Sequence, residues 1–214
     1  MGHASTTKLE NYDIAISLLN ERFGIEVPRG TSDAFRDYIS LIRDWNLFAG
    51  LVSPNDIQVL GAHLADSLSL APYLRTPSET IARCVDIGSG AGFPAVPLAV
   101  IRSSVNFTLW ESNQRKASFI RKIVSTFHLS NCTIRAARFQ AESAESPPDY
   151  ILSRAVSSLE KLLAEYGVWI DEGAVLLYQG PETCSRSGFS QEIISDEFTT
   201  QKLRRSSLSL ITKA

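Results

Sequence analysis

The segment VDIGSGAGFPAVPL (residues 85–98) combines residue types that suit the binding of a ligand against bare backbone. Its first apolar run ends at the carboxylate of Asp86. Glycines follow on alternate positions, Gly88, Gly90 and Gly92, and leave the backbone amides accessible. In an open α/β sheet, the turn from the first strand to the next helix faces the crevice in which ligands bind. We therefore predict a ligand site at this turn.

The glycine spacing and a second carboxylate narrow this ligand to a nucleoside. Dinucleotide-binding turns have the pattern Gly-x-Gly-x-x-Gly, in which the wider spacing admits a pyrophosphate, whereas this turn is more compact. Glu111 ends the next expected strand, 19 residues after Gly92, where an acidic side chain can accept both ribose hydroxyls. The two features together predict recognition of an adenosyl group, with Asp86 and Glu111 taking part, over a turn with a purely structural role.

Two further groups of polar residues are expected to face the same crevice. His63, Asp66 and Ser67 have the spacing i, i+3 and i+4, which places them on one side of a helix. Arg154 directly follows an apolar strand, and the end of such a strand lines the crevice. A buried arginine needs an anionic or planar partner. An ion pair with Asp66 or Asp149 is the structural alternative for Arg154, and simple packing is the alternative for His63.

The elements that must position these residues fall into two parts. Apolar residues at helical spacing predict helices at 9–23, 32–48 and 57–73, before the break RTPSET at 75–80. Strands and helices then alternate, which predicts an α/β fold with a parallel sheet, and residues 198–211 alternate like an antiparallel hairpin at its edge. In this second part we expect strands at 81–87, 107–110, 133–139, 150–156 and 174–178, and helices at 94–101, 113–127 and 158–170.

Composition excludes several classes of protein. The chain has 214 residues and a formal net charge of -2, which counts against indiscriminate nucleic-acid binding but leaves room for a local basic patch. Its three cysteines, Cys84, Cys132 and Cys184, lack ligand spacing, so we expect reduced thiols and no metal. No run approaches the roughly 20 apolar residues of a membrane span, and the N-terminus is unlike a signal peptide. We expect a cytoplasmic monomer without a membrane partner.

Four segments carry a resemblance to a known family. HLADSL (63–68), the glycine segment, LWESNQRKASFIRK (109–122) and DYILSRAVSSL (149–159) have the order and spacing seen in the bacterial 16S rRNA guanine-N7 methyltransferases, also called the glucose-inhibited division protein B family. The similarity extends from about Trp45 to Tyr178. It implies a class I S-adenosylmethionine-dependent methyltransferase fold, Rossmann-like, with a mostly parallel seven-stranded sheet. It also implies a helical N-terminal extension at residues 1–78 that packs on a methyltransferase domain at 79–214.

The resemblance implies a substrate and a set of site residues. The substrate would be N7 of one guanine in 16S rRNA of the small ribosomal subunit, with S-adenosyl-L-methionine as cofactor. His63, Asp66 and Arg154 correspond to residues at the family's active site. The basic residues Arg115 and Lys116 would contact the RNA. The cofactor contacts would be Asp86, Gly88, Gly90, Gly92, Phe93, Glu111, Phe139, Gln140 and Arg154.

Three positions depart from the family's usual pattern. Gly50-Leu51-Val52 stands where members usually have Asn-Leu-Thr, Ala95 where a glycine is frequent, and Gln179 where a lysine is usual. Gln179 would still contact RNA, with one cationic contact fewer. This loss leaves open a diverged relative that binds S-adenosylmethionine but acts on another RNA, or that serves as a ribosome-interaction protein. A nicotinamide-dependent oxidoreductase is a third hypothesis, which the glycine spacing disfavours.

Overall fold

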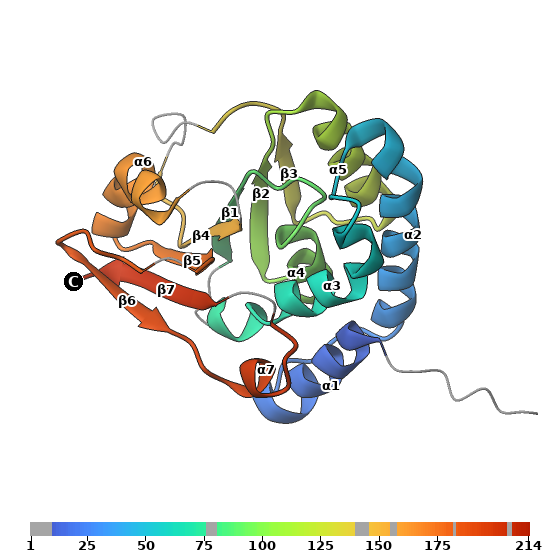
Figure 1. Ribbon diagram of the computed structural model, residues 1–214, viewed down its shortest axis with the longest axis horizontal. Helices are drawn as coiled ribbons and strands as arrows, with labels where there is room; N and C mark the ends of the chain where they lie inside the picture. Colours follow the sequence, from blue (N-terminus) through green and yellow to red (C-terminus); the bar gives the residue numbers. More distant parts are fainter. Residues whose placement is uncertain (1–9, 76–80, 140–145, 155–157, 182, 205–206) are drawn as a thin grey trace, which may run out of the picture.

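Seven strands form one sheet in the order β3-β2-β1-β4-β5-β7-β6 (Figure 1). The computed structural model describes residues 10–75, 81–139, 146–154, 158–181, 183–204 and 207–214. The first five strands of that order run parallel, and β7 and β6 continue the sheet in antiparallel fashion. The predicted α/β class with a mostly parallel sheet is confirmed. The strands are β1 (Ala82–Ile87), β2 (Val105–Trp110), β3 (Cys132–Arg135), β4 (Tyr150–Arg154), β5 (Val175–Gln179), β6 (Phe189–Ile193) and β7 (Leu208–Lys213).

The two faces of the sheet are covered very unequally. Figure 1 shows α1 to α5 gathered on one side and α6 on the other. Alternate residues of β1 accordingly contribute to two hydrophobic clusters, Cys84 to the larger and Val85 and Ile87 to the one beneath α6. The helices are α1 (Asn11–Phe23), α2 (Thr31–Ala49), α3 (Leu60–Leu68), α4 (Ala95–Ile101), α5 (Gln114–Thr126), α6 (Leu159–Asp171) and α7 (Glu197–Thr200), with short 3-10 turns η1 (Asp56–Gln58) and η2 (Ala71–Tyr73).

The N-terminal helices share the larger hydrophobic cluster with the sheet. Tyr38 of α2 is the clearest link: its ring lies 5.5 Å from that of Phe93 and 6.4 Å from that of Phe119, and its hydroxyl donates to the Ala91 carbonyl at 2.5 Å. A buried tyrosine needs such an acceptor. The glycine turn is therefore held from behind by a helix that lies more than 50 residues earlier in the chain.

Two element predictions are wrong in detail. The helix expected at 57–73 is divided into η1, α3 and η2. The hairpin expected within residues 198–211 is made instead by β6 and β7, with α7 between them. Three of the five residues of β6 are polar and three are exposed, so its sequence FSQEI carries little apolar signal. The Asp196 side chain accepts a hydrogen bond from the Thr199 amide at 3.2 Å, which caps α7 where the pattern predicted a strand.

Candidate functional site

A cleft of about 900 Å³ opens where the ends of β1, β4 and β5 meet α3. Its walls come from the glycine turn, the segment before α3 and the loop between β2 and α5. This position is the one at which open α/β sheets bind ligands, because parallel strands end there together. Clefts of several hundred cubic ångströms are typical of ligand sites.

Two glycines of the turn have different surroundings: Gly90 faces the cleft, and Gly92 faces the packed side chains of α2 and α4. Gly90 has a φ of +58°, and a Cβ built on it would meet only the Gly88 carbonyl, at 3.8 Å, so this glycine faces open space. Gly92 has a φ of +93°, and its Cβ would lie 2.6 Å from the Tyr38 hydroxyl and 2.7 Å from Cγ2 of Val96. Gly92 therefore allows α2 and α4 to approach the turn rather than a ligand to enter.

Glu111 joins the glycine turn to the loop before α5. The residue is 8% exposed. One carboxylate oxygen accepts a hydrogen bond from the Gly90 amide at 2.9 Å and the other from the Asn113 amide at 2.8 Å. A carboxylate has about four acceptor positions. The side chain can thus hold the turn in place and still accept two further hydrogen bonds from within the cleft.

Asp86 lies beneath the turn and not in the cleft, contrary to the expectation of a ligand contact. It is 1% exposed, and it points from β1 toward the same side of the sheet as Cys84. Burial raises the pKa of Asp86 from 3.8 to about 7, although a hydrogen bond from Ser89, the charge of Arg154 and the backbone of Ala95 each act to lower it. Asp86 therefore supports the turn and the start of α4.

His63, Phe93 and Arg154 form a stack at the centre of the cleft. The Arg154 guanidinium lies 5.1 Å from the centre of the Phe93 ring, and the His63 ring stacks on Phe93 with centroids 5.7 Å apart. Arg154 also forms an ion pair with Asp66, Nη1 to Oδ2, at 3.4 Å. The structural alternative considered for Arg154 is thus present, and the ion pair fixes the guanidinium at the cleft wall.

The His63 ring pairs with Asp56, a residue that the sequence-based expectations do not include. His63 Nε2 lies 3.0 Å from Oδ1 of Asp56, whose other carboxylate oxygen accepts a hydrogen bond from the Ser53 hydroxyl at 2.7 Å. Asp56 belongs to η1 and lies seven residues before His63. In one continuous helix the two would lie about two turns apart, so helical spacing does not predict their contact. The Ser-x-x-Asp pattern at residues 53–56 was the available signal, because such a serine caps a turn through the aspartate amide.

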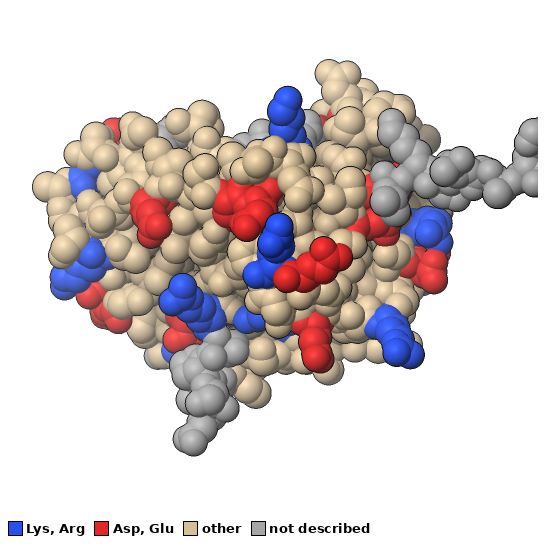
Figure 2. Space-filling view, turned by 90° about the horizontal axis from the view of Figure 1, so that it is seen from below, with Lys and Arg blue, Asp and Glu red and all other residues tan. Residues whose placement is uncertain are grey.

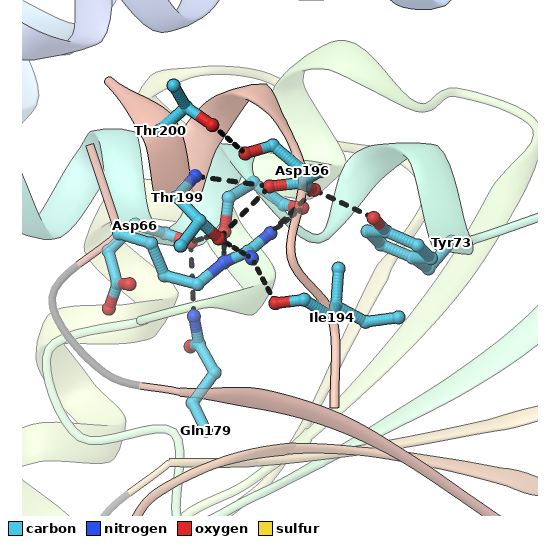
Figure 3. Close-up of polar contacts among 9 residues, drawn as sticks. Asp66, Tyr73, Gln179, Ile194, Asp196, Thr199 and Thr200 are labelled. Atoms are coloured by element: carbon cyan, nitrogen blue, oxygen red, sulfur yellow. Dashed lines mark hydrogen bonds and ion pairs between the residues drawn. The ribbon is translucent and has the colours of Figure 1, made fainter. Parts of the chain in front are cut away.

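Gln179 lines the cleft and is 2% exposed. Figure 3 shows its side chain pointing toward Asp66. Its Nε2 donates to the Asp66 carbonyl at 3.1 Å, and no described residue is hydrogen-bonded to its Oε1. The expected contact of this residue with RNA stays a prediction, since Gln179 lines the cleft while its amide nitrogen is bound to the Asp66 carbonyl. The backbone of Gln179 is paired on both sides, with Arg154 of β4 and Leu208 of β7, and the hydrogen bond to Asp66 holds its side chain against α3.

The remaining expected site residues are dispersed. Phe139 is 7% exposed and packs with Trp110, Tyr166 and Trp169 at centroid distances of 4.9 to 5.1 Å, so it belongs to the cluster beneath α6 and not to the cleft. Gln140 lies outside the described residues. Arg115 is exposed on a neighbouring depression. The cleft itself brings together His63, Asp66, Gly88, Gly90, Phe93, Glu111, Lys116, Arg154 and Gln179.

The structure offers little support for a metal site or a membrane span. Among the described residues, no group of three His, Cys, Asp or Glu side chains could hold a metal ion. No helix in the described part of the chain is long and apolar enough to cross a membrane.

Comparison with known proteins gives the family. The sequence profile of the family described as rRNA small subunit methyltransferase G matches residues 31–204. The chain belongs to this family. The resemblance inferred from the four sequence segments is thereby confirmed, as is the expectation of a methyltransferase.

Individual members of the methyltransferase G family are moderately similar to the chain. The Ribosomal RNA small subunit methyltransferase G of Methylobacillus flagellatus is 31% identical over 157 residues, which are 70% of this chain and 74% of the relative. The protein of the same name from Nitrosomonas europaea is 38% identical over 128 residues, 59% of this chain. That match spans 58% of the Nitrosomonas protein's length.

Solved structures agree with the fold. An O-methyltransferase from Bacillus cereus in complex with SAH has a TM-score of 0.54 at 12% identity, with 94% of this chain and 97% of that one covered. A protein described as a putative O-methyltransferase from Klebsiella pneumoniae has a TM-score of 0.53 at 13% identity, with 94% and 96% covered. At this identity the likeness concerns the fold, which is that of class I S-adenosylmethionine-dependent methyltransferases.

Proposed function

We propose that this chain transfers a methyl group from S-adenosylmethionine to N7 of one guanine in 16S rRNA of the small ribosomal subunit. Membership of the methyltransferase G family supports the reaction and the class of RNA. The observation that carries the proposal is the cleft, in which the glycine turn and Glu111 face the cluster of Asp66, Phe93 and Arg154.

The residues of the cleft fit an adenosyl cofactor. The open space at Gly90 lets a ligand approach the backbone, and the acceptor positions left on Glu111 suit two ribose hydroxyls. Phe93 supplies an apolar surface beside them. S-adenosylmethionine, when bound, supplies an electrophilic methyl group on a sulfonium sulfur. The cofactor would be held by Gly88, Gly90, Phe93 and Glu111.

Methyl transfer to guanine N7 does not require a general base from the protein. Guanine N7 carries a lone pair in the ring plane, so it can attack a methyl group without a general base. The chain must instead align the base and exclude water. His63, held by Asp56 and stacked on Phe93, gives one planar surface against which a base can be oriented. Neither a cysteine nucleophile nor a metal is needed.

Arg154 takes the central binding role in this proposal. A guanidinium is a planar fork that pairs with a carboxylate or with the O6 edge of guanine. Asp66 and Phe93 hold its plane at the cleft wall, which lowers the entropy lost when it binds a partner. Arg154 would therefore hold either the carboxylate of the methionine moiety or the O6 edge of the target guanine.

Transfer of labelled methyl groups to isolated small ribosomal subunits tests the proposal. The subunits come from cells that lack this modification, and large subunits serve as the control. The wild-type chain should label the 16S rRNA of small subunits, and Arg154→Ala should reduce the rate at least about a hundredfold, because it removes a charge-assisted contact. Labelling of large subunits alone, or equal rates for both proteins, would overturn it.

One specific observation favours the alternative of a diverged relative that acts on another RNA. Gln179 replaces the usual lysine of the family, and a buried Gln179 offers the cleft an amide instead of a charge. A diverged relative with another RNA substrate would be recognised by labelling of an RNA other than 16S rRNA in the same experiment. The nicotinamide-dependent oxidoreductase is set aside, because the chain belongs to a methyltransferase family.

A further inference from the structure

Two large apolar side chains lie exposed beside the mouth of the cleft. Leu47 is 100% exposed and Phe48 is 58% exposed at the end of α2. The Arg115 guanidinium lies 5.2 Å from the centre of the Phe48 ring and donates to the Phe48 carbonyl at 3.4 Å. We call these three residues the Phe48 platform.

The Phe48 platform is continuous with the cleft through both of its walls. Residues 47–50 line the depression around Phe48, and residues 51–53, which follow directly, line the cleft. On the opposite wall, residues 113–115 line the depression, whereas Glu111, Ser112 and Lys116 line the cleft. A ligand that leaves the cleft mouth on this side therefore meets Phe48 and Arg115 next.

The chemistry of the platform favours an unpaired nucleotide as its occupant. Proteins recognise single-stranded RNA by stacking bases on aromatic rings and guanidinium planes, and by placing cations along the phosphates. Phe48 offers the ring, Arg115 the guanidinium, and Lys116 a second cation at the adjoining edge of the cleft. By contrast, Figure 2 shows Lys and Arg interspersed with Asp and Glu on the face seen from below, a pattern unsuited to a polyanion.

We propose that an unpaired nucleotide next to the target guanine stacks on the Phe48 platform while the guanine occupies the cleft. This inference rests on the proposed function. The platform thereby selects RNA in which the target guanine lies in a single-stranded loop, because a base in a continuous duplex cannot present its face to Phe48. A second copy of this chain is the competing occupant.

Binding of small ribosomal subunits, measured by filter retention, tests the platform without relying on catalysis. Phe48→Ala should raise the Kd for the subunits at least about fivefold, since base stacking on an aromatic ring is lost. Phe48→Trp should retain binding, whereas Phe48→Leu, which is apolar but has no π face, should behave like the alanine variant. Val168→Ala is the matched control, because Val168 is 54% exposed on α6 across the sheet. It should bind as the wild type does.

Two further readouts separate stacking from charge and from a structural role. The salt dependence of binding should be unchanged in Phe48→Ala, and it should fall by about one unit of slope in Arg115→Gln, which removes one cation. In methyl transfer, Phe48→Ala should raise KM for the subunits by more than it changes kcat. The Kd for S-adenosylmethionine should be the same in all platform variants.

The outcomes distinguish this inference from the proposed function. If the wild type methylates subunits and Phe48→Ala binds them as tightly as the wild type does, no nucleotide stacks on the Phe48 platform, and the proposed function stands. If no methyl transfer occurs, the proposed function fails, and the Kd series still decides whether RNA stacks on Phe48. A wild-type dimer that Phe48→Ala dissociates, seen by sedimentation, would assign the platform to a second copy and overturn the inference.

Discussion

At Glu111 one carboxylate serves both the fold and the proposed cofactor. It is nearly buried and accepts hydrogen bonds from two backbone amides, Gly90 and Asn113. Glu111→Ala leaves both amides without their acceptor. We therefore expect the free energy of unfolding without ligand to fall by about 1–3 kcal/mol, and the Kd for S-adenosylmethionine to weaken at least about tenfold. Urea unfolding and calorimetry measure the two effects.

Glu21→Ala is the control for this substitution, because Glu21 is exposed on α1 far from the turn. It should leave both quantities unchanged. Loss of stability in Glu111→Ala with an unaltered Kd would confine Glu111 to a structural role.

Asp86 makes the stability of the protein depend on pH between about pH 4 and pH 7. Its pKa in the folded protein is raised by burial from 3.8 to about 7, so the folded state retains a proton that the unfolded state releases. The free energy of unfolding contributed by this group is therefore greatest below pH 4. It falls as pH rises toward 7, by up to about 1.4 kcal/mol per pH unit.

Asp86→Asn tests this pH dependence, since the amide has a similar shape and does not titrate. The stability of the variant relative to the wild type should increase steadily between pH 4 and pH 7 in urea unfolding. Asp44→Asn, at an exposed position of α2, provides the comparison and should show no such trend. A constant difference between Asp86→Asn and the wild type across this window would contradict the raised pKa.

Prediction from the sequence succeeded for residues whose position follows from the strand order. Gly90, Glu111 and Arg154 each lie at or just after the end of a parallel strand, and such ends meet at one edge of the sheet. The Asp56–His63 pair could not be predicted in this way, because in one continuous helix the two residues would lie about two turns apart, and only the break between η1 and α3 brings them into contact. The burial of Asp86 and Gln179, which are 1% and 2% exposed, also escaped prediction, because a polar residue at the end of a strand gives no sign of whether its side chain packs inside the fold.

At the scale of elements, the glycine turn is expected to respond differently at two of its positions. A Cβ added at Gly92 would collide with Tyr38 and Val96. A Cβ added at Gly90 would collide with nothing, and its only cost would be the strain of a side-chain-bearing residue at positive φ. Gly92→Ala should therefore lower the free energy of unfolding by several kcal/mol, on the order of overpacking plus strain, and Gly90→Ala by about 1 kcal/mol. Gly90→Val should in addition weaken cofactor binding while unfolding stays cooperative.

Thermal and urea unfolding of the two alanine variants measure the difference directly. Equal losses of stability would mean that α2 and α4 yield to an added methyl group. Full cofactor affinity in Gly90→Val would remove Gly90 from the ligand site.

The C-terminal strands are tied to α3 and η2 by a buried ion pair (Figure 3). Arg204 and Asp196 lie 2.9 Å apart, with side chains 3% and 9% exposed, and Asp196 also accepts the Tyr73 hydroxyl at 2.7 Å. Arg204 donates to the Ser69 hydroxyl at 3.1 Å, directly after α3. Arg204→Met would leave a buried carboxylate without its cation, so the free energy of unfolding should fall by about 3–5 kcal/mol.

An exposed pair provides the matched control for Arg204→Met. Arg36 and Asp33 are 66% and 77% exposed, and Arg36→Met should leave stability nearly unchanged. Combining Arg204→Met with Asp196→Leu should recover part of the loss in urea unfolding. If the double variant is no more stable than Arg204→Met, the cost arises from packing and not from the uncompensated charge.

At the scale of the whole molecule, the sequence predicts the order of the elements, but it predicts only part of how they pair and pack. Alternating strands and helices gave the parallel sheet, because their apolar patterns differ in period. The sequence predicts the antiparallel edge but misplaces its strands, since three of the five residues of β6 are polar and three are exposed. The role of the N-terminal helices depends on Tyr38 reaching the glycine turn, a contact over 53 residues that no local pattern reveals. We propose that residues 1–78 act as an extension that braces the methyltransferase domain.

Mass-spectrometric mapping of methylated nucleosides in 16S rRNA tests the central claim most directly. The rRNA is taken from cells in which the gene is deleted, and from the same cells after expression of the wild-type chain or of Arg154→Ala. We expect that one guanine lacks its N7 methyl group in the deletion, regains it with the wild type and does not regain it with the variant. An unchanged pattern of 7-methylguanosine in the deletion, or restoration of a different methylated nucleoside, would contradict it.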